Sequence, residues 1–169
     1  TFASPMLQSL ARSVHVSGSR TGIEPAKSEL KSAEKLFRRA LKAEPGFVEA
    51  RVRLGRVLYL LGEAEEAART LREAVATLLA QQAPSDAPDT RLQLYLAEMF
   101  YGAAEEQLGQ RDRAKASYTR AAELYPAAPS PRLALSQLAL SGNDHALALE
   151  AVEHALLAPA GARGRADPR

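Results

Sequence analysis

Cysteine and tryptophan are absent from the 169-residue sequence, and aromatic residues make up only 5% of it. The lack of cysteine excludes disulfides, thiolate nucleophiles and thiolate metal ligands. It suits a cytoplasmic protein and an exported or periplasmic one equally, so both compartments stay open. Sheets are usually rich in aromatic and β-branched residues, whereas this chain has 34 alanines. The composition therefore predicts an all-α protein.

The chain also lacks a marked excess of one sign of charge and a long run of apolar residues. The 22 basic and 20 acidic residues give a net charge of +2, which does not indicate nucleic-acid binding. The most apolar stretch, residues 57–61, ends at Gly62 and is far shorter than the roughly 18 residues needed to cross a bilayer. We expect no membrane span. Since the sequence begins with Thr1, we expect a processed chain or a piece of a longer one.

Residues that could carry catalysis are sparse. The three histidines, His15, His145 and His154, lie in no metal-binding motif, and no phosphate-binding loop or nucleophile elbow occurs. Glu150 and His154 are four residues apart on an expected helix, where a surface ion pair is far commoner than a metal site. We expect neither an enzyme nor a bound metal or cofactor.

Alanines recur at a fixed spacing along the chain. Pairs of alanines seven residues apart occur four times, and a larger apolar residue stands four residues after the first alanine of each pair. These sets are Ala33, Phe37 and Ala40; Ala67, Leu71 and Ala74; Ala114, Tyr118 and Ala121; and Ala148, Val152 and Ala155. The first and last steps between sets are 34 residues, and the middle step is 47, which implies a 13-residue insertion. The spacing indicates repeated helical units.

Two further small or helix-ending residues keep the same spacing. Twelve residues before the first alanine of the last three sets stand Gly55, Gly102 and Ser136, where helices can cross closely. Five residues before it stand Gly62, Gly109 and Asn143, which readily end a helix in the left-handed conformation.

This pattern resembles the tetratricopeptide repeat, a 34-residue unit of two antiparallel helices. The family has small residues at positions 8, 20 and 27 and a large one at position 24. Pro45 and Pro126 fall at position 32, where proline ends the second helix, whereas Leu79 and Ala160 depart from this pattern. The resemblance covers about residues 25–160 and implies an all-α fold, a right-handed α-solenoid of antiparallel helix pairs.

The periodicity and the repeat together predict a domain layout. Helices are expected at about residues 25–43, 47–61, 64–82, 89–108, 111–125, 130–141 and 144–158. We expect a partial unit at 25–47, full units at 48–81, 95–128 and 129–160, and an insertion at 82–94 through which the stack continues. Residues 1–24 are expected to be irregular with a short amphipathic helix at 5–13, and 161–169 to be a flexible tail.

The resemblance also implies where a partner binds. In this family the first helices of the units line a concave groove, and their groove-facing positions map onto the following residues: Glu49, Val52, Arg53, Arg56, Tyr59, Met99, Phe100, Ala103, Glu106 and Gln137. No unit has the Lys and Asn of the carboxylate clamp that grips acidic chaperone tails. We expect a partner peptide or helix with an acidic portion and an apolar anchor.

Three functions remain open. The first is a protein–protein interaction module or scaffold. The high content of Ala, Leu and Arg suggests that such a module is bacterial. The second is an accessory region of a larger enzyme or assembly. The third is self-association, in which the segment from Met6 to Val14 or the last helix docks onto another copy. Alternatively, Met99 and Phe100 pack internally and the arginines pair with Glu49 or Glu63.

Overall fold

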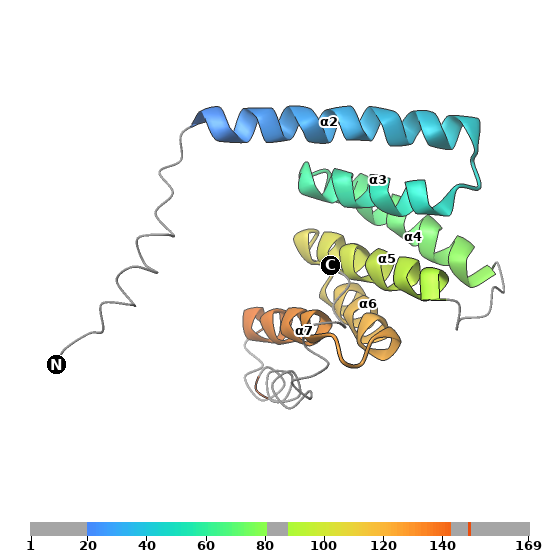
Figure 1. Ribbon diagram of the computed structural model, residues 1–169. Helices are drawn as coiled ribbons and strands as arrows, with labels where there is room; N and C mark the ends of the chain where they lie inside the picture. Colours follow the sequence, from blue (N-terminus) through green and yellow to red (C-terminus); the bar gives the residue numbers. More distant parts are fainter. Residues whose placement is uncertain (1–19, 81–87, 143–148, 150–169) are drawn as a thin grey trace.

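The computed structural model describes residues 20–80, 88–142 and 149 of the chain, and these form helices joined by short turns without any strand (Figure 1). The helices are α2 (Arg20–Ala43), α3 (Val48–Leu60), α4 (Ala64–Ala80), α5 (Pro88–Gln107), α6 (Arg111–Leu124) and α7 (Pro129–Ser141). The all-α prediction is confirmed, and α3 to α7 match the expected helices within two residues at each end. The expected helices at 5–13 and 144–158 and the tail at 161–169 lie outside the described residues, Leu149 apart.

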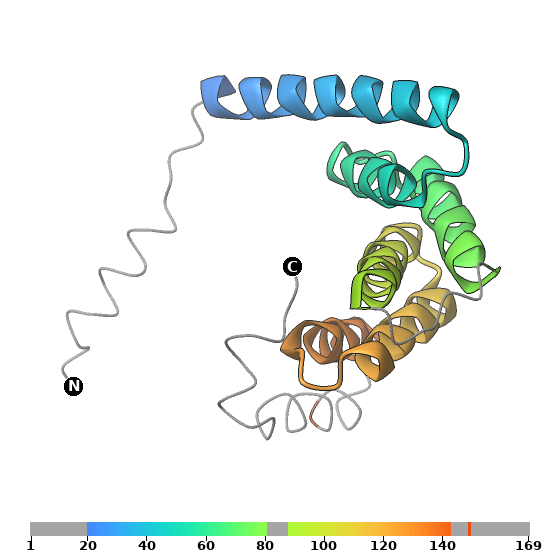
Figure 2. The same ribbon diagram turned by 45° about the vertical axis from the view of Figure 1, so that its right-hand side comes forward.

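The helices form antiparallel pairs that follow one another along an arc (Figure 2). Each helix from α2 to α7 packs against the next one, and α3 also contacts α5. The contact between α4 and α5 bridges the 13-residue insertion, because α4 ends just before the insertion and α5 begins within it, at Pro88. The described helices therefore form one continuous α-solenoid.

Helix α2 differs from the prediction at its start. It begins at Arg20 and not near residue 25, so Pro25 lies in its second turn. A proline there removes one backbone hydrogen bond and crowds the carbonyl four residues earlier, yet the helix continues through it. Helices α4 and α6 begin three residues before the first alanine of their sets, Ala67 and Ala114. Helix α2 begins thirteen residues before its own, Ala33. Helix α2 is thus about ten residues longer than its counterparts at its N-terminal end.

The small residues lie where helices of a pair cross. A Cβ atom added to Gly55 of α3 would lie 2.4 Å from Cγ of Leu71 in α4, and one added to Gly102 of α5 would lie 2.7 Å from Cε1 of Tyr118 in α6. Both distances are shorter than any real contact, so only glycine allows this approach. Leu71 and Tyr118 fill the space and are 0% and 3% exposed.

The first helices of two pairs end in the same way. Gly62 and Gly109 follow α3 and α5 with φ angles of 81° and 72°. The N–H groups of Gly62 and Glu63 donate to the carbonyls of Tyr59 and Leu58, and the same two bonds recur after α5. This is the Schellman motif, which satisfies the last carbonyls of a helix and needs a left-handed residue. The predicted helix ends at these glycines are confirmed.

The apolar side chains form two neighbouring cores. The first joins α3, α4 and α5 around Leu58, Leu71 and Ala97, and the second joins α5, α6 and α7 around Tyr95 and Tyr118. Since α5 contributes to both cores, it links the two halves of the solenoid.

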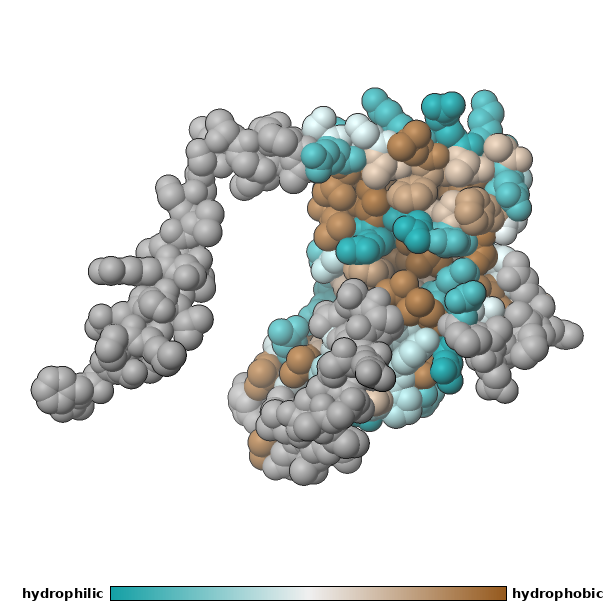
Figure 3. Space-filling model, in the orientation of Figure 1, coloured by the Kyte–Doolittle hydropathy of each residue, from teal (hydrophilic) through white to brown (hydrophobic). Residues whose placement is uncertain are grey.

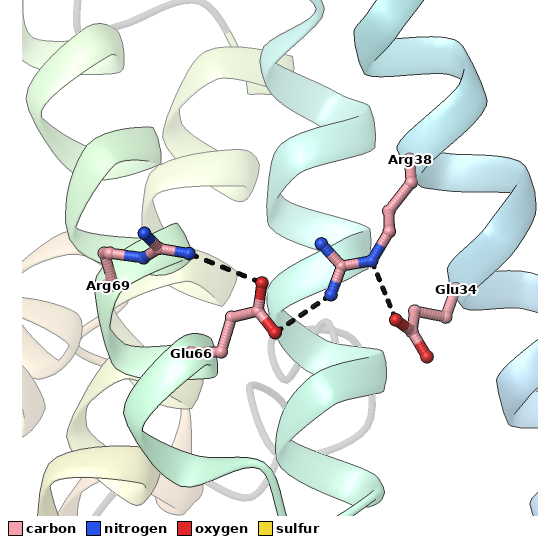
Figure 4. A network of polar contacts seen from close by, with 4 residues as sticks. All are labelled: Glu34, Arg38, Glu66 and Arg69. Atoms are coloured by element: carbon pink, nitrogen blue, oxygen red, sulfur yellow. Dashed lines mark hydrogen bonds and ion pairs between the residues drawn. The ribbon is translucent and has the colours of Figure 1, made fainter.

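Polar contacts join the helices outside the cores. Arg38 of α2 donates to Glu34 of its own helix and to Glu66 of α4, which also pairs with Arg69 (Figure 4). Between α5 and α6, Arg120 of α6 donates to both carboxylate oxygens of Glu98 in α5. These contacts tie each second helix to a neighbour.

Candidate functional site

A groove of about 430 Å³ lies between α3 and α5, the first helices of two consecutive pairs. Successive turns of each helix supply side chains to it at helical spacing. Its lining consists of Glu49, Val52, Arg53 and Arg56 from α3, and of Asp89, Leu92, Gln93, Leu96 and Phe100 from α5. It is open to solvent, and its length along two parallel helices suits an extended or helical segment.

The groove has an apolar floor with charges at its sides. Val52 is buried, and Leu92, Leu96 and Phe100 are half-buried. Arg53 donates to Glu49 at 2.6 Å, so these two opposite charges largely offset each other. Asp89 stands on the α5 side of the groove and is exposed. The floor can accept an apolar anchor, and the rim can accept charged groups.

Arg56 is the basic group of the groove whose charge is least compensated. Its guanidinium carbon lies 5.3 Å from the centre of the Phe100 ring, a cation–π distance. Across residues 27–80 and 89–142, no carboxylate lies within ion-pair distance of Arg56. The Phe100 ring in turn lies 6.0 Å from that of Tyr59. The Phe100 ring therefore holds the Arg56 guanidinium in position, and the charge of Arg56 is left without a carboxylate partner among these residues.

The structure brings only some of the predicted residues together. Glu49, Val52, Arg53, Arg56 and Phe100 line the groove, and Tyr59 lies beside it against Phe100. The alternative that arginines pair with neighbouring acids holds for Arg53 and not for Arg56.

The other predicted residues lie elsewhere. Met99 is 7% exposed and packs in the second core, so its expected place in the groove is wrong. Met99 and Phe100 leave α5 about 100° apart, so that Phe100 lines the groove while Met99 packs in the second core. Glu106 accepts a hydrogen bond from Tyr118 at 2.8 Å; burial and this bond raise the pKa of Tyr118 well above its usual value. Ala103 is half-buried on α5, and Gln137 is exposed on α7.

Three groove residues lie outside the repeat unit onto which the groove positions were mapped: Asp89, Leu92 and Gln93. They lie in the first turns of α5, before residue 95 where the repeat unit was expected to begin. The signal was present in the spacing of residues 89, 92, 93, 96 and 100, which fall on one helical face. The insertion lengthens α5 and thereby extends the groove.

Among the residues that the structure describes, no three acidic or histidine side chains lie close enough to hold a metal ion. None of the described helices is both long and apolar enough to span a membrane.

Two profiles of the tetratricopeptide repeat match the chain, at residues 26–99 and 102–166. The chain belongs to the tetratricopeptide repeat family. Each profile covers one half of the solenoid, and the boundary between them falls inside α5. This tetratricopeptide repeat chain has no match among curated protein sequences.

Solved structures with the same fold carry the name MamA. A crystal structure of MamA has 22% sequence identity and a TM-score of 0.65, over 79% of this chain and 70% of that one. MamA residues 41 to the end from Desulfovibrio magneticus RS-1 have 22% identity and a TM-score of 0.64, over 76% of this chain. A double mutant of MamA RS-1 has 23% identity and the same TM-score. This chain spans 66% and 65% of the lengths of the last two, respectively, and the likeness establishes the fold alone.

Proposed function

We propose that this chain is a protein–protein interaction module that holds a peptide or helix of a partner protein in the groove between α3 and α5. The observation that carries the proposal is the pairing of an apolar floor with Arg56, whose charge no described carboxylate offsets. Membership in a family of interaction modules supports a binding role rather than a catalytic one.

The groove favours a partner with a particular chemistry. An aliphatic or aromatic anchor would cover Leu96 and Phe100, and a neighbouring carboxylate would pair with Arg56. Asp89, near the opposite wall, would favour a basic or hydrogen-bond-donating group at that side of the partner. Arg53 contributes less attraction than its charge suggests, since Glu49 already accepts from it.

Selection from a random peptide library displayed on phage, with the whole chain as bait, tests this proposal. We expect enrichment of peptides that carry an apolar anchor next to an acidic residue. Fluorescence anisotropy with a selected peptide should show at least a tenfold weaker affinity for Arg56→Glu. Arg39→Glu makes the same charge change at an exposed site of α2 outside the groove and should leave the affinity unchanged. Equal affinities of the wild type and Arg56→Glu, or equal losses in both variants, would overturn the proposal.

A further inference from the structure

One face of α2 lacks the neighbour that its counterparts have. Together with the start of α3 it forms a recess of about 320 Å³ lined mainly by Leu36, Phe37, Ala40, Phe47 and Ala50, here called the α2 recess. Leu36 and Phe47 are 60% and 41% exposed, although both are large apolar residues. In the orientation of Figure 1, Figure 3 shows apolar surface over α2 and α3, crossed by a band of polar residues.

The repeat itself shows what this face would contact. Phe37 stands at the position that Leu71 and Tyr118 occupy in the next two units, and those residues pack onto Gly55 and Gly102 of their first helices. The alanines on either side of Leu71 and Tyr118 in the pattern are all 0% exposed. Ala33, Phe37 and Ala40 are only half-buried. The α2 recess is therefore the place of a first helix.

The stretch of chain that would form this first helix at the spacing of the repeat is already part of α2. Twelve residues before Ala33 stands Thr21, which belongs to α2 itself. The helix that covers the recess must come from a segment outside the described helices or from another molecule.

The N-terminal segment has the pattern of such a helix. Leu10, Ala11 and Val14 repeat the spacing of Leu54, Gly55 and Leu58 in α3, with a small residue between the same two apolar ones. Leu7 adds an apolar residue one turn earlier on the same face. In this register Ala11 would face Phe37, as Gly55 faces Leu71.

The length of the connection decides which molecule the segment comes from. Phe37 lies 17 residues from the start of α2, or about 25 Å along the helix at 1.5 Å per residue. If the segment runs antiparallel to α2 with Ala11 beside Phe37, Val14 lies three residues, or about 4.5 Å, nearer to the start of α2. With a spacing of about 9 Å between helix axes, Val14 would then lie about 23 Å from Arg20. The six residue steps between them span at most about 22 Å even when fully extended. A second copy of the chain has no such restriction.

We propose that the α2 recess receives residues 5–14 of a second copy, in reciprocal exchange. Each copy then supplies the missing first helix of the other, which gives a closed dimer with twofold symmetry. This interface lies beyond the function proposed above, but the two are adjacent, since Glu49 and Arg53 line both the α2 recess and the groove.

The natural absence of cysteine makes a direct test possible. Ala11→Cys and Phe37→Cys are introduced into separate full-length chains, which are mixed, oxidised and run on a non-reducing gel. We expect a disulfide-linked pair of chains, since a side chain at Gly55 would lie within disulfide range of that of Leu71. In the chain that carries both cysteines, we again expect linked pairs. A band of one-chain mass with a closed disulfide, or no disulfide, would overturn the proposal.

Light scattering provides the second measurement. The full chain should approach twice its mass of 18.2 kDa as its concentration rises, and deletion of residues 1–16 should leave a monomer. Phe37→Asp should raise the dimer dissociation constant at least tenfold. Leu140→Asp changes an exposed leucine on α7, which is 53% exposed, and should have no effect. A full chain that stays monomeric, or a deletion variant that still dimerises equally well, would contradict the exchange.

Discussion

Arg120 of α6 holds the carboxylate of Glu98 in α5 through two hydrogen bonds, of 2.6 and 3.0 Å. The partners differ in environment, because Glu98 is 1% exposed whereas the side chain of Arg120 is 47% exposed. Arg120 therefore reaches in from the surface to neutralise a buried charge. The carboxylate bond raises the pKa of the guanidinium, which stays charged throughout the accessible pH range.

Arg120→Met is expected to lower the free energy of unfolding by about 2–4 kcal/mol, because it leaves a buried carboxylate without its counter-charge. Urea denaturation followed by circular dichroism measures the change. Arg53→Met serves as a control, since its ion pair with Glu49 is exposed and should contribute less than about 1 kcal/mol. A second variant, with Glu98→Met added to Arg120→Met, should recover much of the loss. A loss no larger than that of Arg53→Met would mean that Glu98 does not depend on Arg120.

Gly55→Ala is expected to destabilise the chain by about 1–3 kcal/mol, because the new methyl group would lie 2.4 Å from Cγ of Leu71. A double-mutant cycle in urea isolates this contact. In the background of Leu71→Ala the same substitution should cost less, since the side chain that it meets has been removed. Gly46→Ala meets no atom within 4 Å and should change stability by less than about 1 kcal/mol. A cost that is the same in both backgrounds would place the effect elsewhere.

Local chemistry explains why α3 to α7 could be predicted. Glycines in the left-handed conformation, and prolines that follow α2 and α6, mark helix ends without reference to the rest of the fold. The start of α2 could not be placed in this way, because Pro25 favours a helix start, whereas α2 begins five residues before it.

The groove shows a different limit. Its α3 wall follows from the groove-facing positions that the repeat family implies, and so was predicted. Its α5 wall depends on how far the insertion lengthens α5, which the repeat does not specify. Contacts such as Arg120 with Glu98, 22 residues apart on two helices, depend on how those helices are rotated against each other. The repeat pattern fixes the crossing points but does not identify these polar partners.

Gly62→Ala is expected to cost about 1 kcal/mol for a reason that involves no contact. Gly62 has a φ of 81° and no atom within 4 Å of an added Cβ, so the cost comes from the left-handed backbone alone. Gly62→Asn should cost less than Gly62→Ala, because asparagine tolerates this conformation better. Thermal unfolding of the two variants provides the comparison. If alanine and asparagine are equally tolerated, the Schellman turn does not limit stability at this helix end.

Arg38→Met is expected to destabilise the chain in a way that depends on pH. A hydrogen bond from Arg38 lowers the pKa of Glu66 below its usual value near 4.5 (Figure 4). The folded chain therefore binds this proton less readily than the unfolded chain does, and the unfolded chain gains from protonation in acid. The stabilisation is complete above the usual pKa and disappears as the pH falls through the lowered one.

At pH 7 the loss should be about 1 kcal/mol, since the side chains of Arg38 and Glu66 are 42% and 31% exposed and solvent screens the pair. Urea denaturation at a series of pH values between 7 and 3 should show the wild type and Arg38→Met converging in stability as Glu66 is protonated. Arg39→Met, an exposed neighbour on the same helix, should keep a constant offset from the wild type. A gap between Arg38→Met and the wild type that stays constant down to pH 3 would show that Arg38 acts through its aliphatic packing. In that case the link between α2 and α4 would not be electrostatic.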